Sequence, residues 1–128
     1  MLPLFLFATG IENSYPTING GKTRIDEMDT CGHYKHWRTD FDRVEHLGIS
    51  YLRYGPPIHR TWLGSDRYDW TLADETFHDL RKRDIVAITD PATFRPDRKL
   101  PEPRSAAAIC KLLRAFASRY PWCSSIPP

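Results

Sequence analysis

Two pairs of adjacent carboxylates are the first residues in this sequence whose types could support acid/base chemistry, Asp26 with Glu27 and Asp74 with Glu75. Acid/base catalysis by two carboxyl groups needs both side chains to reach the same reacting group. Neighbouring residues of a helix do not share a face. We therefore interpret both pairs as surface or helix-capping groups and predict no catalytic residue from them.

A metal site is the second possibility, because His33 and His36 are three positions apart on a predicted helix and Cys31 is close by. A helix start whose polar groups cap the first turn explains these residues much better, so we predict no metal site. The three cysteines, which include Cys110 and Cys123, form no C-x-x-C pair. They favour neither a disulfide framework nor a zinc site, and a reducing, cytoplasmic location is expected.

The composition predicts one domain. The 128 residues are 41% hydrophobic, and the formal net charge of +2 gives no field that favours nucleic acid or an anionic membrane. Met1–Ala8 is apolar, but it lacks a positive n-region and contains Pro3, so we interpret it as a buried strand and not as a signal peptide. No apolar run approaches the roughly 20 residues that span a bilayer, so no membrane partner is expected.

The first predicted strand is the continuous apolar run of residues 4–7, which ends at Thr9 and Gly10. Such a run is typical of a strand that is buried on both faces of a parallel sheet. Residues 11–30 are rich in Asn, Gly, Asp and Thr and have no period of either kind. They predict a long loop after this strand.

A helix is predicted after this loop, because Trp37, Phe41 and Val44 recur at helical spacing. Gly48 stands where a left-handed residue ends a helix, and the strand-forming residues 49–54 follow. They predict the second strand.

Residues 55–70 contain two prolines in succession and a Gly-Ser-Asp turn, so they predict a second long loop. Thr71 with Asp74 three residues later resembles a capping box and predicts that a second helix begins here. The basic residues 81–83 suit the carboxyl end of this helix. Residues 85–88 are apolar and predict a third strand. The apolar stripe of this second helix comprises Ala73, Phe77 and Leu80.

Strands that alternate with helices at this spacing predict an α/β fold with right-handed parallel crossovers. A doubly wound open sheet and a closed barrel both satisfy that pattern. Residues 8–13 read A-T-G-I-E-N and lack the glycine fingerprint of the doubly wound class. We therefore predict the first three βα units of a (β/α)8 TIM-type barrel, truncated, with both long loops at the carboxyl ends of strands, where barrels carry their chemistry.

The order of these segments resembles the opening of family 1 glycoside hydrolases, the β-glucosidase-like (β/α)8 enzymes. It is most similar to a divergent subgroup that can be fused to a dTDP-4-dehydrorhamnose reductase-like domain. The resemblance covers residues 2–90 and about 109–122. The segments that carry it are F-A-T-G-I-E at 7–12, H-Y-K-H-W-R-T-D at 33–40, L-G-I-S-Y-L-R-Y at 47–54, Y-D-W at 68–70 and R-D-I-V-A-I-T-D at 83–90.

The resemblance implies site residues. Arg53 matches the arginine that supports the catalytic carboxylates in that family, and Glu12 with Asn13 falls where the family binds the innermost sugar. An arginine suits this role because it is permanently charged and forks onto a carboxylate. The family needs no cofactor or metal. Its two catalytic carboxylates come from the fourth and seventh strands, so we predict no catalytic residue in residues 1–128.

The sequence departs from the family after the third strand. The family expects a histidine in a segment such as D-L-C-H-F, whereas residues 90–94 read D-P-A-T-F. Deletion of one base from codons for L-C-H-F yields P-A-T followed by F or L, so a frameshift is our hypothesis for residues 91–108. Residues 123–128 replace the expected fourth strand and suggest a second shift.

The predicted function is therefore that of a fragment of a β-glucosidase-like glycoside hydrolase, inactive by itself. Two alternatives stay open: a non-catalytic carbohydrate-binding or interaction fragment, and the N-terminal part of a sugar-nucleotide reductase fusion. Carbohydrate is the expected partner, bound weakly or not at all by this chain. Open sheet edges also predict self-association. The aromatic loop residues Trp62, Tyr68 and Trp70 could stack on sugars, but we expect them to pack the loop.

Overall fold

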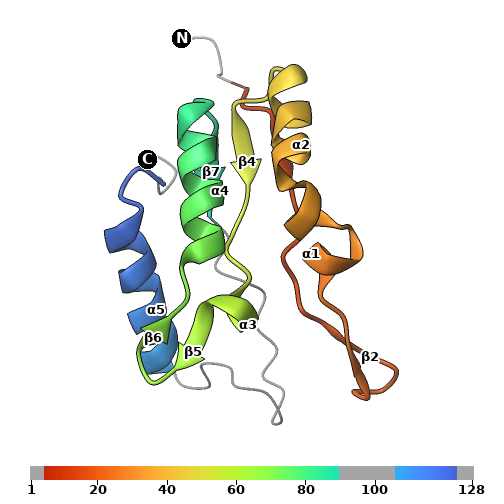
Figure 1. Ribbon diagram of the computed structural model, residues 1–128, viewed down its shortest axis with the longest axis vertical. Helices are drawn as coiled ribbons and strands as arrows, with labels where there is room; N and C mark the ends of the chain where they lie inside the picture. The colour runs from red at the N-terminus through yellow and green to blue at the C-terminus, as the bar shows by residue number, and fades with distance from the viewer. Residues whose placement is uncertain (1–4, 90–105, 124–128) are drawn as a thin grey trace.

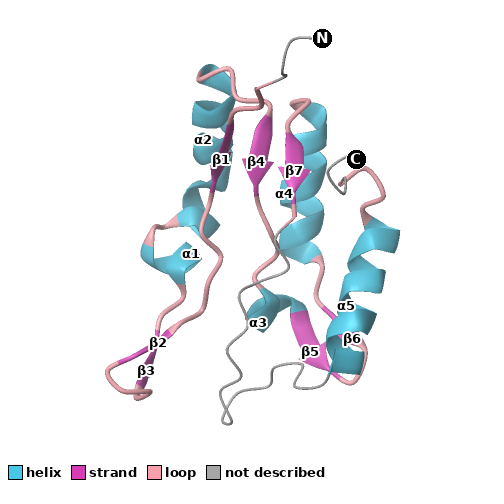
Figure 2. Cartoon of the chain, turned by 180° about the vertical axis from the view of Figure 1, so that it is seen from behind, coloured by secondary structure: helices cyan, strands magenta, loops and turns pink. Residues whose placement is uncertain are grey.

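A three-stranded parallel sheet organises the computed structural model, which describes residues 5–89 and 106–123. Its strands are β1 (Ala8–Gly10), β4 (Tyr51–Arg53) and β7 (Val86–Ile88), paired in the order β1-β4-β7. Thr9, Leu52 and Ala87 lie in one row across the sheet, and Gly10, Arg53 and Ile88 lie in the next. The predicted α/β class with parallel strands in sequential order is therefore confirmed (Figure 2).

The long helices α2 (His33–His46), α4 (Thr71–Lys82) and α5 (Ala106–Arg119) lie on one side of this sheet (Figures 1 and 2). Leu52 and Ala87 belong to the core between the sheet and these helices. Because side chains alternate along a strand, Arg53 lies on the opposite face, where it is exposed. In the described part of the chain, no helix covers that face.

The sequence pattern of α2 explains its place. Trp37, Phe41 and Val44 are buried, as their helical spacing predicts. Leu47 caps the helix, and Gly48 follows with a φ of 69°. This left-handed conformation favours glycine, and it turns the chain into β4.

The apolar stripe of α4 is also confirmed, since Ala73, Phe77 and Leu80 are buried. The predicted capping box is wrong. Trp70 is the N-cap residue and makes no side-chain capping bond. The Asp69 carboxylate instead accepts a hydrogen bond from the Thr71 backbone N–H at 2.9 Å. The Asp74 carboxylate accepts a hydrogen bond from Arg119 of α5.

Helix α5 packs against α4 through aromatic rings. The ring centroids of Phe116 and Tyr120 each lie 5.1 Å from that of Phe77. The Asp74 carboxylate accepts hydrogen bonds from the Arg119 guanidinium at 2.5 and 2.7 Å and from the Tyr120 hydroxyl at 2.7 Å. Helix α5 therefore lies beside α4, and the two helices are consecutive members of one layer.

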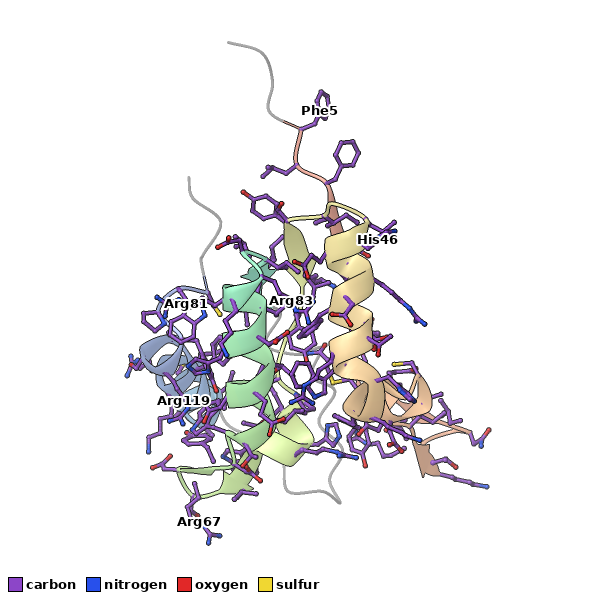
Figure 3. All side chains as sticks on the ribbon, turned by 45° about the horizontal axis from the view of Figure 1, so that its top comes forward. Phe5, His46, Arg67, Arg81, Arg83 and Arg119 are labelled. Carbon is purple, nitrogen blue, oxygen red and sulfur yellow. The ribbon has the colours of Figure 1, made fainter. Side chains whose placement is uncertain are left out.

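The start of the chain differs from the prediction. Strand β1 begins only at Ala8, and Phe5 and Phe7 are each 79% exposed. Figure 3 shows the Phe5 side chain away from the helices. Ala8 pairs with Tyr51, the first residue of β4, so the residues before Ala8 extend past the end of the neighbouring strand. The prediction of a strand buried on both faces at 4–7 is therefore wrong for its described residues, 5–7.

Both long loops contain regular structure that the sequence pattern did not indicate. The first holds a hairpin of β2 (Thr17–Ile18) and β3 (Thr23–Arg24), followed by α1 (Glu27–Thr30). The second holds α3 (Ile58–Thr61) and a hairpin of β5 (Trp62–Gly64) and β6 (Arg67–Tyr68). Figure 1 shows both loops at the end of the molecule toward which β4 points. They therefore extend from the carboxyl edge of the sheet, as predicted.

The frameshift hypothesis falls mostly on residues 90–105 and 124–128, which lie outside the described residues. Helix α5 begins at Ala106, inside the segment 91–108 that we had assigned to a shifted frame. Among the described residues, no helix combines the length and apolarity that crossing a lipid bilayer would need.

Candidate functional site

The carboxyl ends of β1 and β4 bring two of the three predicted site residues together. Gly10 pairs with Arg53, and the Ile11 backbone N–H donates to the Arg53 carbonyl oxygen at 3.1 Å. In this register the two strands stay paired up to their last residues. It places Arg53 Nη2 3.2 Å from Glu12 Oε2. The predicted pair is thus an ion pair at the carboxyl edge of the sheet.

Gly10 leaves room for the Arg53 side chain. A Cβ atom at this position would lie 3.2 Å from Arg53 Nε, closer than most carbon contacts allow. A larger residue at this position would require the Arg53 side chain to shift by a few tenths of an ångström.

The Glu12 carboxylate is held in its charged form. It accepts hydrogen bonds from the hydroxyl and from the backbone N–H of Ser14, the second at 2.9 Å. The hydrogen bond from the Ser14 hydroxyl is the largest cause that lowers the pKa of Glu12. Burial opposes it, and the Ser14 backbone N–H and the Arg53 guanidinium each lower the pKa by less. Glu12 is therefore an acceptor of hydrogen bonds at neutral pH and not a proton donor.

The pair is accessible to a ligand. The side chains of Arg53 and Glu12 are 46% and 49% exposed. Glu12 also lines an open cavity of about 370 Å³ that extends between β1 and α2, where Glu27 and Asp40 add carboxylates and Arg43 adds a guanidinium. Arg53 is not among the residues that line this cavity.

Asn13, the third predicted site residue, lies in a different environment. It is buried, with 5% of its surface exposed, whereas its neighbour Glu12 is half exposed. Little of its amide is therefore open to solvent. The sugar-binding role of Asn13, like those of Glu12 and Arg53, stays a prediction.

A second polar cluster joins the two long loops around Asp26. The Tyr34 hydroxyl donates to both carboxylate oxygens of Asp26, at 3.1 and 2.9 Å, and His59 Nε2 lies 2.7 Å from Oδ2. Arg60 Nε lies 3.5 Å from the same oxygen, and its guanidinium stacks over the Tyr34 ring at 3.7 Å. The His59 ring is stacked on Tyr15 at a centroid distance of 4.0 Å. Asp26 thus tethers α3 to the loop that follows β1.

The electrostatics of Asp26 follow from these contacts. Burial disfavours its charged form, but the hydrogen bonds from His59 and Tyr34 outweigh burial and lower the pKa of the Asp26 carboxyl. Asp26 also accepts from the Asp29 backbone N–H, so the predicted capping role is confirmed. No sequence pattern indicates the contact between Asp26 and His59, because the two residues are 33 positions apart. The signal that could have found it is that both lie in loops that leave the carboxyl ends of neighbouring strands.

Both ring nitrogens of His33 lie within hydrogen-bonding distance of side chains. The residue is fully buried, with Nδ1 2.8 Å from Asp40 Oδ2 and Nε2 2.9 Å from the Tyr54 hydroxyl oxygen. His36, on the same helix, is exposed. Within residues 5–89 and 106–123, no three side chains of the types that bind metals are grouped closely enough to hold an ion.

The chain was compared with protein-family models, with curated proteins and with solved structures, and none of the three comparisons gave a match. We therefore infer the function from the residues and their geometry.

Proposed function

We propose that this chain supplies the first three βα units of a (β/α)8 barrel, the N-terminal part of a β-glucosidase-like glycoside hydrolase. Three features support the barrel: the sequential strand order β1-β4-β7, the helices α2, α4 and α5 on one side of the sheet, and the long loops at its carboxyl edge. In a barrel the helices form an outer layer, and the uncovered face of the sheet becomes the interior.

One half of a doubly wound sheet also contains parallel strands in sequential order. That class binds nucleotides through a glycine-rich turn after the first strand, where a tight turn lets the backbone approach the phosphates. Residues 8–13 have a single glycine, and Glu12 places a carboxylate beside this turn. A carboxylate would repel a pyrophosphate. The barrel is therefore the better interpretation.

The observation that carries the functional proposal is the Glu12–Arg53 ion pair. It is accessible, and it lies at the carboxyl ends of adjacent strands, where barrel enzymes bind their substrates. An ionised carboxylate accepts hydrogen bonds from sugar hydroxyls, and a guanidinium donates them. The pair would thus hold a sugar ring and orient a carboxylate group contributed by a later strand.

Hydrolysis itself is assigned to residues outside the described part of the chain. A retaining glycosidase uses two carboxyl groups about 5–5.5 Å apart, one as nucleophile and one as acid/base. The resemblance assigns them to the fourth and seventh strands of the barrel. Residues 5–89 and 106–123 therefore contribute scaffold and sugar contacts, and they require no cofactor for either role.

The nucleotide sequence of the locus tests this proposal. We expect a neighbouring reading frame to restore a histidine after β7 and to continue past residue 122 into a fourth strand that ends in a T-x-N-E-P-like motif. A locus in which no frame continues the family pattern would contradict the proposal.

Saturation-transfer NMR with methyl β-D-glucopyranoside separates the proposal from a carbohydrate-binding function. A chain that binds the glycoside through Arg53, while its extended form hydrolyses nothing, would be a binding module. Arg53→Gln tests the contact, and Arg67→Gln is the matched control, because Arg67 is an exposed arginine of the β5–β6 hairpin.

A further inference from the structure

The most exposed apolar segment of the described chain lies directly before β1. Phe5 and Phe7 are each 79% exposed and Leu6 is 53% exposed. Successive side chains of an extended segment point to opposite sides, so neither side of this segment is covered. Figure 3 shows the Phe5 side chain projecting away from the rest of the molecule, beyond the amino end of the sheet. Three consecutive large apolar side chains in water indicate a surface that binds a partner.

The strand that continues this segment has a free edge. Strand β1 pairs with β4 on one side, and in the described part of the chain no strand pairs with it on the other. A free edge presents unpaired backbone N–H and C=O groups, which are a template for another strand. Residues 5–10 therefore combine a free backbone edge with uncovered apolar side chains.

We infer that residues 5–9 form an antiparallel strand pair with the same residues of a second copy of this chain, which makes a symmetric dimer. A two-fold interface brings identical surfaces together, so the segment must be complementary to itself. Pairing centred on Phe7 sets Phe7 opposite Phe7, Leu6 opposite Ala8 and Phe5 opposite Thr9. Aromatic and aliphatic pairs of this kind stabilise neighbouring strands.

The distribution of charge favours a second copy as the partner. Residues 5–11 contain no charged side chain, so the paired segments bring no like charges together. The first charge after the segment is Glu12. In an antiparallel pair the two Glu12 side chains lie at opposite ends of the interface. Each copy then keeps its Glu12–Arg53 pair at the open carboxyl edge. In the closed barrel of the proposed function an eighth strand would take this edge of β1, so the dimer is inferred for residues 1–128 without that strand.

Sedimentation-velocity ultracentrifugation of the full chain over a range of concentrations tests the dimer. The chain should shift from monomer to dimer as its concentration rises. Phe7→Lys should abolish the dimer, because it places two ammonium groups opposite each other at the two-fold axis. Leu63→Lys is the matched control: Leu63 is 51% exposed on β5, at the other end of the molecule, and its substitution should leave the dimer unchanged (Figure 1).

A charge-swap experiment identifies the register. Phe7→Lys and Phe7→Glu should each be monomeric alone, and an equimolar mixture should form a dimer of one copy of each, because opposite charges then meet at the centre. Far-UV circular dichroism should show the wild-type fold in both variants, since the Phe7 side chain is exposed.

Three results would overturn the inference. They are a wild-type chain that stays monomeric at all concentrations, a Phe7→Lys variant that still associates, or a mixture that does not recover the dimer. A monomeric chain that sediments with phosphatidylcholine vesicles would assign the segment to a membrane surface instead.

Discussion

The guanidinium of Arg53 lies 3.2 Å from the carboxylate of Glu12, so the first two strands of the sheet end on one ion pair. Hydrogen bonds from Ser14 and the charge of Arg53 together lower the pKa of Glu12. We therefore expect Arg53→Gln to raise the pKa of Glu12, and Ser14→Ala to raise it further, because the Ser14 hydroxyl is the larger cause. Carboxyl ¹³C NMR titration measures both shifts.

The same pair should contribute little to stability. A carboxyl whose pKa is lowered in the folded state stabilises the protein above its unfolded pKa of about 4.3, and this contribution is lost as the pH falls through the folded pKa. Since both side chains are half exposed, we expect Arg53→Gln to lower the free energy of unfolding at pH 7 by less than about 1 kcal/mol. A larger loss would mean that Arg53 has a mainly structural role.

His33 should make stability dependent on pH. Burial lowers the pKa of His33, and the hydrogen bond with Asp40 opposes this only in part. The unfolded chain then binds a proton more readily than the folded protein, so the free energy of unfolding should fall as the pH drops below about 6.5. Urea denaturation at pH 7.5, 6.5 and 5.5 measures this dependence.

The test variant for that experiment is His33→Gln, and its matched control is His36→Gln on the same helix. His33→Gln should flatten the dependence below pH 6.5, whereas His36→Gln should leave it unchanged, because His36 is exposed. Equal slopes in the wild type and in His33→Gln would show that another group titrates.

Arg83 should hold α2 and α4 together. Its Nη1 lies 2.7 Å from Asp42 and 2.8 Å from Glu45 on α2, and its Nε lies 2.6 Å from Asp79 on α4 (Figure 3). Removal of the guanidinium leaves three carboxylates close together without a cation. We expect Arg83→Met to lower the free energy of unfolding by about 1–3 kcal/mol, measured with urea at pH 7.

Arg83→Lys distinguishes the geometry of that contact from its charge. Lysine keeps the charge but cannot donate in the planar fork of a guanidinium, so it should recover only part of the loss. If Arg83→Met were as stable as the wild type, the two helices would be held by apolar packing alone.

Phe116 should fix α5 to α4. It is buried on α5, and its ring centroid lies 5.1 Å from that of Phe77 on α4. Phe116→Ala should cost about 3–5 kcal/mol, because truncation of a buried aromatic ring leaves a cavity. Thermal unfolding monitored by circular dichroism measures the loss. Ala117→Ser, on the exposed face of the same helix, should have almost no effect, and a similarly small effect of Phe116→Ala would place α5 outside the core.

The helices could be predicted from the sequence because their signals are local. Helical spacing indicates which face of α2 and α4 is buried, and Gly48 marks the end of α2. The first strand could not be placed in this way. Residues 5–7 have the composition of a buried strand, but burial depends on the neighbouring strand, which begins opposite Ala8. An apolar run alone carries no information about where its partner starts.

The candidate site shows the same limit. The resemblance to family 1 glycoside hydrolases selected Glu12 and Arg53, and they lie together because parallel strands end at one edge. The partners of Asp26 could not be predicted from the sequence. Its contact with His59 depends on how two long loops pack against each other, and no periodic pattern encodes this.

The central claim is that Arg53 and Glu12 form part of a sugar-binding site in a glycosidase barrel. Its most direct test is the rate of 4-nitrophenyl β-D-glucopyranoside hydrolysis by the protein expressed from a reading frame extended past residue 122. We predict that the extended protein hydrolyses this substrate and that its Arg53→Lys variant loses roughly 100-fold in kcat, because a lysine cannot orient the carboxylates as the guanidinium fork does. An extended protein that is well folded but hydrolyses no β-glycoside, or an Arg53→Lys variant with the wild-type kcat, would contradict the claim.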